Sequence, residues 1–158
     1  VFQLSSRPML LVKDDLYSIR PVKRVLVALD KSDMAKESLK AALSLTRDIK
    51  DSELIFVHTL SNLRSSIDEA INANPESDPV LMPAIAEAKR YNINYRCIAP
   101  EGKPGKRICQ LADGLNVNLL ILGSPDRRPS IAKGLPDIDR LLGGSLSDYV
   151  RINAPCPV

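Results

Sequence analysis

The chain has 158 residues, of which 44% are hydrophobic and 4% aromatic, and its net charge is +3. This length and apolar content suit one domain with its own core, while the few aromatic residues and the scattered charges disfavour nucleic-acid binding. Cys97, Cys109 and Cys156 form no CxxC motif, so neither a disulfide framework nor a zinc site is indicated. A reducing, cytoplasmic compartment is expected. No apolar run reaches the roughly 18 residues of a membrane span, so direct membrane insertion is not expected.

Short apolar runs alternate with helical patterns along the chain. The predicted elements, in chain order, are a strand at residues 23–29, a helix at 32–47, a strand at 53–60, helices near 63–73 and 80–90, a strand at 92–99, a helix beginning at 104, a strand at 118–122 and a helix from about 145 to 153. Ser32 is the expected N-cap of its helix. The run at 92–99 is polar for a central strand and is therefore expected at or near a sheet edge.

Strands that alternate with helices predict βαβ units, and hence an α/β fold with a doubly wound, mainly parallel sheet. Ligands of such sheets bind beyond the carboxyl ends of the strands, at the point where the strand order reverses. The residues that follow the strands, Asp30, Thr59 and Gly123, are therefore the first candidates for a binding site.

Three features of this edge favour a nucleotide. Asp30 can accept hydrogen bonds from an adenine amino group or a ribose hydroxyl, although a turn or capping role is the alternative. Gly123 would let a ligand approach the backbone, or is simply a turn glycine. The run Gly143-Gly144-Ser145-Leu146-Ser147 opens the last helix, where free amides and hydroxyls can bind phosphate. An ordinary N-cap serine is the alternative there.

These residues resemble the universal stress protein family. The similarity is carried by Asp30 after the first strand, Val57-His58, Gly102-Lys103-Pro104, Val117–Gly123, Gly144-Ser145 and the ending Ala154-Pro155-Cys156-Pro157-Val158. It spans about Lys23 to Val158. The resemblance implies a five-stranded Rossmann-like sheet of the adenine nucleotide alpha hydrolase-like type and frequent dimerisation. In one branch of the family it also implies bound ATP or another adenine nucleotide, which Mg²⁺ could accompany.

The nucleotide-binding branch has a glycine pattern that this chain matches with one interruption. Gly123, Gly134 and Gly144-Ser145 fit the pattern, but residues 124–133 stand where the family has two residues. The resemblance implies adenine contacts at Ala28, Leu29, Asp30 and Thr59, and phosphate contacts at Gly134, Gly144, Ser145, Leu146 and Ser147. The inserted Arg127 and Arg128 are candidates for a bidentate phosphate clamp, with a partner-binding surface loop as the alternative.

The single histidine, His58, lies in an apolar run, where we expect a buried structural role. Without a second histidine or paired cysteines, neither a metal site nor a catalytic set is indicated. We therefore predict a regulatory or stress-response module that binds an adenine nucleotide without being an enzyme and acts through dimerisation or partner contact. The alternatives are a non-nucleotide interaction module of the same fold, which could belong to a tandem or transporter-linked protein, and an ATP-using transferase or ligase.

The N-terminal residues 1–22 are expected to lie outside the domain at 23–158. Residues 1–9 share a valine and a proline with residues 150–158 when the two are aligned. Residues 1–13 are therefore a candidate tail of a preceding similar domain, followed by a linker at 14–22, although an ordinary extension is the alternative. We expect Met9–Val12 to form a strand at the sheet edge, in this subunit or a neighbour.

Overall fold

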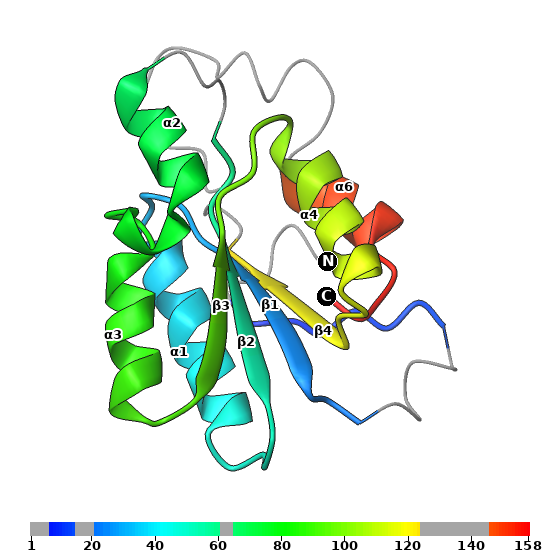
Figure 1. Ribbon diagram of the computed structural model, residues 1–158. Coiled ribbons are helices and arrows are strands. Elements are labelled where there is room, and N and C mark those ends of the chain that lie inside the picture. The colour runs from blue at the N-terminus through cyan, green and yellow to red at the C-terminus, as the bar shows by residue number, and fades with distance from the viewer. Residues whose placement is uncertain (1–6, 15–20, 61–64, 124–145) are drawn as a thin grey trace, which may run out of the picture.

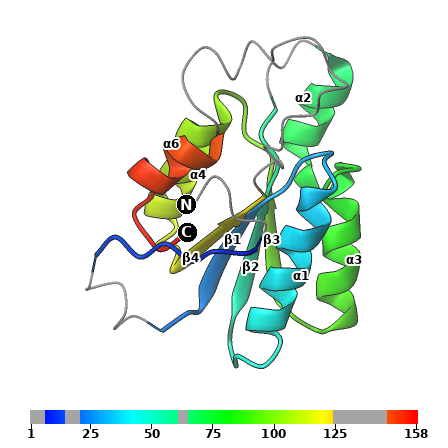
Figure 2. The ribbon, with the colours of Figure 1, turned by 180° about the vertical axis from the view of Figure 1, so that it is seen from behind.

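A computed structural model describes residues 7–14, 21–60, 65–123 and 146–158. The strands are β1 (Arg24–Ala28), β2 (Glu53–Val57), β3 (Asn94–Ile98) and β4 (Leu119–Leu122). The helices are α1 (Met34–Thr46), α2 (Ser66–Ala73), α3 (Met82–Arg90), α4 (Pro104–Gly114) and α6 (Leu146–Asn153), with a short 3-10 helix, η3 (Pro75–Ser77). Figures 1 and 2 show from opposite sides that α1 and α3 cover one face of the sheet, whereas α4 and α6 cover the other. The predicted α/β class is confirmed.

The four strands of the described residues form one parallel sheet in the order β3-β2-β1-β4. The chain passes from β1 to β2 on one side and returns to β4 on the other, so the strand order reverses between β1 and β4. β3 lies at an edge, as its polar sequence predicted. The binding region is therefore expected beyond Ala28 and Leu122, which are paired in the sheet.

Alternating side chains of the central strands fill two separate cores. Leu54 and Phe56 pack with α1 and α3, whereas Ile55 and Val57 pack with α4 and α6. A strand covered on both faces is apolar at every position, which explains the continuous hydrophobic runs. On the second face, α4 and α6 approach so closely that a Cβ atom at Gly105 would lie 2.7 Å from the Tyr149 ring.

The prediction of five strands is not met in the described residues, because the C-terminal tail adds only a short stretch beside β4. The amide of Leu120 donates to the carbonyl of Pro157 at 3.0 Å, which places the tail where a further strand would pair. Leu11 and Val158 then exchange two backbone hydrogen bonds of 2.7 and 3.1 Å, the pattern of an antiparallel pair. Met9–Val12 forms no regular strand, but Leu11 does occupy the edge in this same chain.

The segment that contains Leu11 also contacts the end of α6. The ammonium group of Lys13 donates to the carbonyls of Ile152 and Ala154 at 2.8 and 2.9 Å. These carbonyls belong to the last turn of the helix and the residue after it, where a cation is favoured because the helix leaves carbonyls without internal partners. The N-terminal segment thus fastens α6 at its carboxyl end.

Candidate functional site

A cavity of about 140 Å³ opens at the carboxyl ends of β1, β2 and β4. Six residues that the sequence nominated line it: Ala28, Leu29, Asp30, Thr59, Gly123 and Leu146. Further walls come from His58, from Ala35 at the start of α1 and from Pro104 at the start of α4. The structure therefore brings the expected adenine-side residues together at the point where the strand order reverses.

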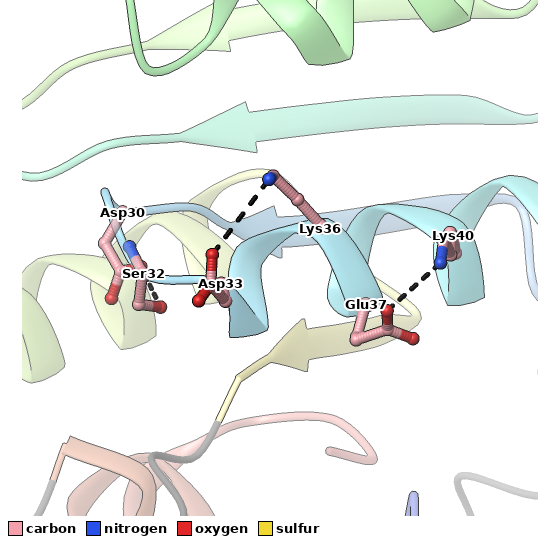
Figure 3. Close-up of polar contacts among 6 residues, drawn as sticks. All are labelled: Asp30, Ser32, Asp33, Lys36, Glu37 and Lys40. Atoms are coloured by element: carbon pink, nitrogen blue, oxygen red, sulfur yellow. Dashed lines mark hydrogen bonds and ion pairs between the residues drawn. The ribbon is translucent and has the colours of Figure 1, made fainter.

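Asp30 follows β1 and its carboxylate organises the turn into α1 (Figure 3). Its Oδ1 accepts hydrogen bonds from the Ser32 amide at 2.8 Å and from the Ser32 hydroxyl at 2.5 Å. Ser32 is therefore not the N-cap: α1 has Asp33 at that position, without a side-chain capping bond. Because the Ser32 hydroxyl is used by the turn, it is not available to the helix. Within the described residues, Oδ2 of Asp30 has no hydrogen-bond partner.

Thr59, just beyond β2, carries a polar atom that the described part of the protein does not satisfy. Its Oγ1 is buried and has no hydrogen-bond partner among those residues, although Thr59 lines the cavity. Buried hydroxyls almost always have partners, since removing one from water without compensation costs about 1–3 kcal/mol. This hydroxyl is therefore a candidate contact for a ligand that enters the cavity.

Gly123 lines the cavity, but packing explains why this residue is glycine. A Cβ atom here would lie 2.6 Å from Cβ of Met34 and 3.2 Å from its backbone carbonyl group. Such distances are below van der Waals contact, so a side chain would push the first turn of α1 away from β4. The glycine therefore lets helix and strand meet and does not by itself indicate a ligand.

The phosphate side of the predicted site is only partly described. Leu146, the first residue of α6, lines the cavity, whereas Ser147 is buried at 5% exposure and does not. The remaining nominated residues lie outside the described residues: Gly134, Gly144, Ser145, Arg127 and Arg128. The described residues therefore cover the part of the predicted site assigned to the base or sugar, and the phosphate contacts stay predictions.

A histidine–aspartate pair beside the cavity was not predicted from the sequence. His58 directly follows β2, and its Nδ1 lies 2.6 Å from Oδ2 of Asp78. Asp78 is 1% exposed, and its Oδ1 accepts the amide of Val80 at 2.9 Å. His58 is thus partly buried and paired, and it is not enclosed in the strand as expected. The only local signal was an Asp-Pro dipeptide before a helix, which indicates a turn but not its distant partner.

The cysteines behave as small apolar side chains. Burial raises the pKa of the Cys156 thiol to about 12, and burial, with smaller contributions from Glu76 and Asp78, raises the pKa of Cys97 to about 11. Burial also raises the pKa of Cys109. Protonated thiols are poor nucleophiles and poor metal ligands.

No cluster of three or more metal-ligating side chains occurs in residues 7–14, 21–60, 65–123 and 146–158. None of the helices described has the length and apolar character that crossing a bilayer requires.

The fold recurs in solved structures. A universal stress protein from Archaeoglobus fulgidus DSM 4304 matches with a TM-score of 0.66 and 22% identity, covering 94% of this chain and 47% of that one, so this chain spans about half its length. A family member from Arabidopsis thaliana, solved with AMP bound, matches with a TM-score of 0.58 and 18% identity, and the match covers 86% of this chain and 88% of that one. A universal stress protein in complex with cAMP matches with a TM-score of 0.59 and 21% identity, and the match covers 85% of this chain and 91% of that one.

Sequence comparison identifies the family directly. The chain is 28% identical over 150 residues to the universal stress protein YxiE of Bacillus subtilis strain 168, which covers 85% of this chain and 95% of that protein. Residues 21–158 match the profile of the universal stress protein family. This range includes both cores, the whole sheet and every residue that lines the cavity. The chain therefore belongs to the universal stress protein family.

Proposed function

We propose that this protein is a regulatory module that binds an adenine nucleotide and takes the base or ribose into the cavity between β1, β2 and β4. The observation that carries the proposal is the buried hydroxyl of Thr59, which has no partner in the described residues and belongs to a residue that lines this cavity. Asp30, which also lines the cavity, adds a second hydrogen-bond acceptor. The relatives solved with AMP and with cAMP support an adenine ligand.

The chemistry of the cavity suits an adenosine moiety. The side chains of Leu29, Ile108 and Leu122 supply apolar walls for a flat ring. The free oxygen of Asp30 can accept from a ribose hydroxyl, as acidic residues after a strand do in dinucleotide-binding folds. A cavity of about 140 Å³ is smaller than the roughly 300–1,000 Å³ of sites that enclose a whole drug-sized ligand. Only a ring-sized part of the nucleotide would therefore be enclosed, and the phosphates would extend beyond it.

The phosphates are assigned to the start of α6, at Gly134, Gly144, Ser145, Leu146 and Ser147, with Arg127 and Arg128 as a clamp and Mg²⁺ as a companion ion. Binding, not catalysis, is the proposed role, exerted in the cytoplasm through dimerisation or contact with a partner. A tandem arrangement, with residues 1–13 as the tail of a preceding domain and 14–22 as a linker, belongs to the same proposal.

Two measurements test nucleotide binding. Denaturing the freshly purified protein should release an adenine nucleotide that mass spectrometry identifies, and calorimetric titration of the emptied protein should show saturable binding of AMP. GMP is the matched control, because its base carries an oxo group where adenine has its amino group. Absence of both co-purified nucleotide and AMP binding would contradict the proposal.

An interaction module without a nucleotide is the second candidate. It is favoured by the packing of Gly123 against Met34, which explains the glycine without a ligand. This candidate predicts no binding of AMP, ADP or ATP, together with capture of a partner protein that is insensitive to added nucleotide. The same titration therefore separates the two functions.

A further inference from the structure

The His58–Asp78 pair joins two elements that are far apart in sequence. His58 lies one residue beyond β2, whereas Asp78 lies between η3 and α3, and their side chains meet at 2.6 Å. The side chain of Asp78 is 1% exposed and that of His58 is 17% exposed. A buried carboxylate is tolerated only when its oxygens are hydrogen-bonded. Asp78 therefore needs the bond to His58 for the stability of the fold, whether or not a ligand binds.

Asp78 is a rigid anchor because its own backbone is held by the start of α3. Its amide donates to Pro75, and its carbonyl accepts from Leu81 and Met82 at 3.0 Å each. Its Oδ1 is occupied by the amide of Val80, so Oδ2 is left for His58. A carboxylate oxygen accepts hydrogen bonds, so the contact with Oδ2 requires the His58 tautomer that carries its hydrogen on Nδ1. Nε2 makes no hydrogen bond with the described residues.

The pair is connected to the cavity through Thr59. The backbone on either side of Thr59 is bonded to the end of β3 and the chain just after it: the His58 amide donates to Ile98 at 3.2 Å, and the Leu60 amide donates to Pro100 at 2.8 Å. His58 and Thr59 both line the cavity. The hydrogen bond between the His58 imidazole and Asp78 thus adds a side-chain contact to these backbone bonds. It holds His58, the residue directly before Thr59, whose hydroxyl has no partner in the described residues.

We infer that His58, held by Asp78, is a positioning residue of this site: the bond through Nδ1 fixes the end of β2 so that Thr59 presents its hydroxyl to the ligand. The inference rests on the proposed function, because the ligand is the adenosine part of a nucleotide. The inference also assigns this role to Nδ1 and not to Nε2, so that His58 acts through its bond to Asp78 and makes no hydrogen bond to the ligand.

Two substitutions separate the roles of the two ring nitrogens. The amide nitrogen of asparagine can occupy the place of Nδ1, whereas that of glutamine reaches the place of Nε2. In the full chain, His58→Asn should keep the calorimetric AMP dissociation constant within about twofold, while His58→Gln and His58→Leu should weaken binding by about tenfold or more. Retained affinity in His58→Gln with loss in His58→Asn would assign a direct ligand contact to Nε2 and overturn the inference, and unchanged affinity in all three would also overturn it.

A ligand-free readout keeps this test apart from the proposed function. The side-chain rotamer of Thr59, measured by three-bond NMR couplings, should change in His58→Gln and in Asp78→Leu but not in His58→Asn, at a temperature where thermal unfolding shows every variant to be folded. An unchanged Thr59 rotamer in His58→Gln and Asp78→Leu would overturn the inference. If the wild-type protein binds no AMP while the rotamer changes as expected, the proposed function fails and the positioning of Thr59 stands.

Discussion

The amino ends of β1 and β4 are joined by a side chain, whereas their carboxyl ends open into a cavity. At the amino ends, Oδ1 of Asn118 accepts the amides of Lys23 and Arg24 at 3.1 and 2.8 Å, and the Asn118 amide donates to Arg24 at 2.8 Å. At the carboxyl ends, Thr59 has an unsatisfied hydroxyl and Asp30 a free carboxylate oxygen within the described residues. Side-chain polar groups at the amino end bond across the two strands, while the carboxyl end has polar atoms without partners among the described residues.

Replacing Gly123 by alanine should have the largest effect, because the added methyl group would clash with α1 beside the cavity. The new Cβ would lie 2.6 Å from Cβ of Met34, so we expect a loss of about 1–3 kcal/mol in the free energy of unfolding and weaker AMP binding. Denaturant unfolding and calorimetry measure both effects. Gly114→Ala is the matched control, because no atom lies within 4 Å of its new Cβ, and helical alanine should be neutral or stabilising by up to about 1 kcal/mol. Equal destabilisation by both changes would refute the packing explanation.

Two threonines with buried hydroxyls, one toward each end of the sheet, sharpen the comparison. Thr59→Val removes a hydroxyl that makes no hydrogen bond with the described residues, so AMP binding should weaken by about tenfold without loss of folding stability. Thr46→Val removes the 2.7 Å bond from its hydroxyl to the Ala42 carbonyl and should cost about 1 kcal/mol of stability while AMP binding is unchanged. If Thr59→Val lost stability and kept its affinity for AMP, the assignment of Thr59 to a ligand would be wrong.

The amino end can be weakened separately through Asn118. Asn118→Ala leaves the amides of Lys23 and Arg24 without their side-chain acceptor, so the free energy of unfolding should fall by about 1 kcal/mol. The dissociation constant for AMP should not change, because Asn118 lies at the far end of the sheet. A parallel loss of AMP binding would show that the two ends do not act independently.

The smallest effect concerns the predicted phosphate clamp. Changing both Arg127 and Arg128 to alanine should weaken ATP binding by a few-fold or more, since each guanidinium can form paired, charge-assisted bonds to phosphate. Adenosine has no phosphate, so its affinity should be unchanged in a parallel titration. Identical ATP affinities before and after the substitution would remove the clamp and leave the loop to a partner protein.

The sequence predicted the architecture better than the polar chemistry. Hydrophobic periodicity located the four strands of the described residues, because a run such as Leu119–Leu122 reflects burial on both faces of the sheet. The same reasoning assigned Ser32 to a helix cap, where the structure uses it to hold Asp30. Both roles suit a serine after a strand, and only the folded turn selects one.

The His58–Asp78 pair and the number of strands could not be predicted from the sequence, because both depend on contacts between residues far apart in the chain. His58 and Asp78 are separated by 20 positions, and no local pattern reports which carboxylate a turn will bring to a strand end. The fifth strand was expected from family resemblance. Its place is taken by a short tail and by Leu11, a pairing that depends on contacts between distant parts of the chain.

The contact of the N-terminal segment with α6 has a consequence for how the molecule assembles. Lys13 bonds to carbonyls 139 and 141 positions later in the chain, so a very long loop must close before this contact can form. Such contacts form after the local helices and hairpin-like units of a folding chain. During synthesis, Lys13 is made well before α6, so this edge of the sheet can close only after α6 has been made.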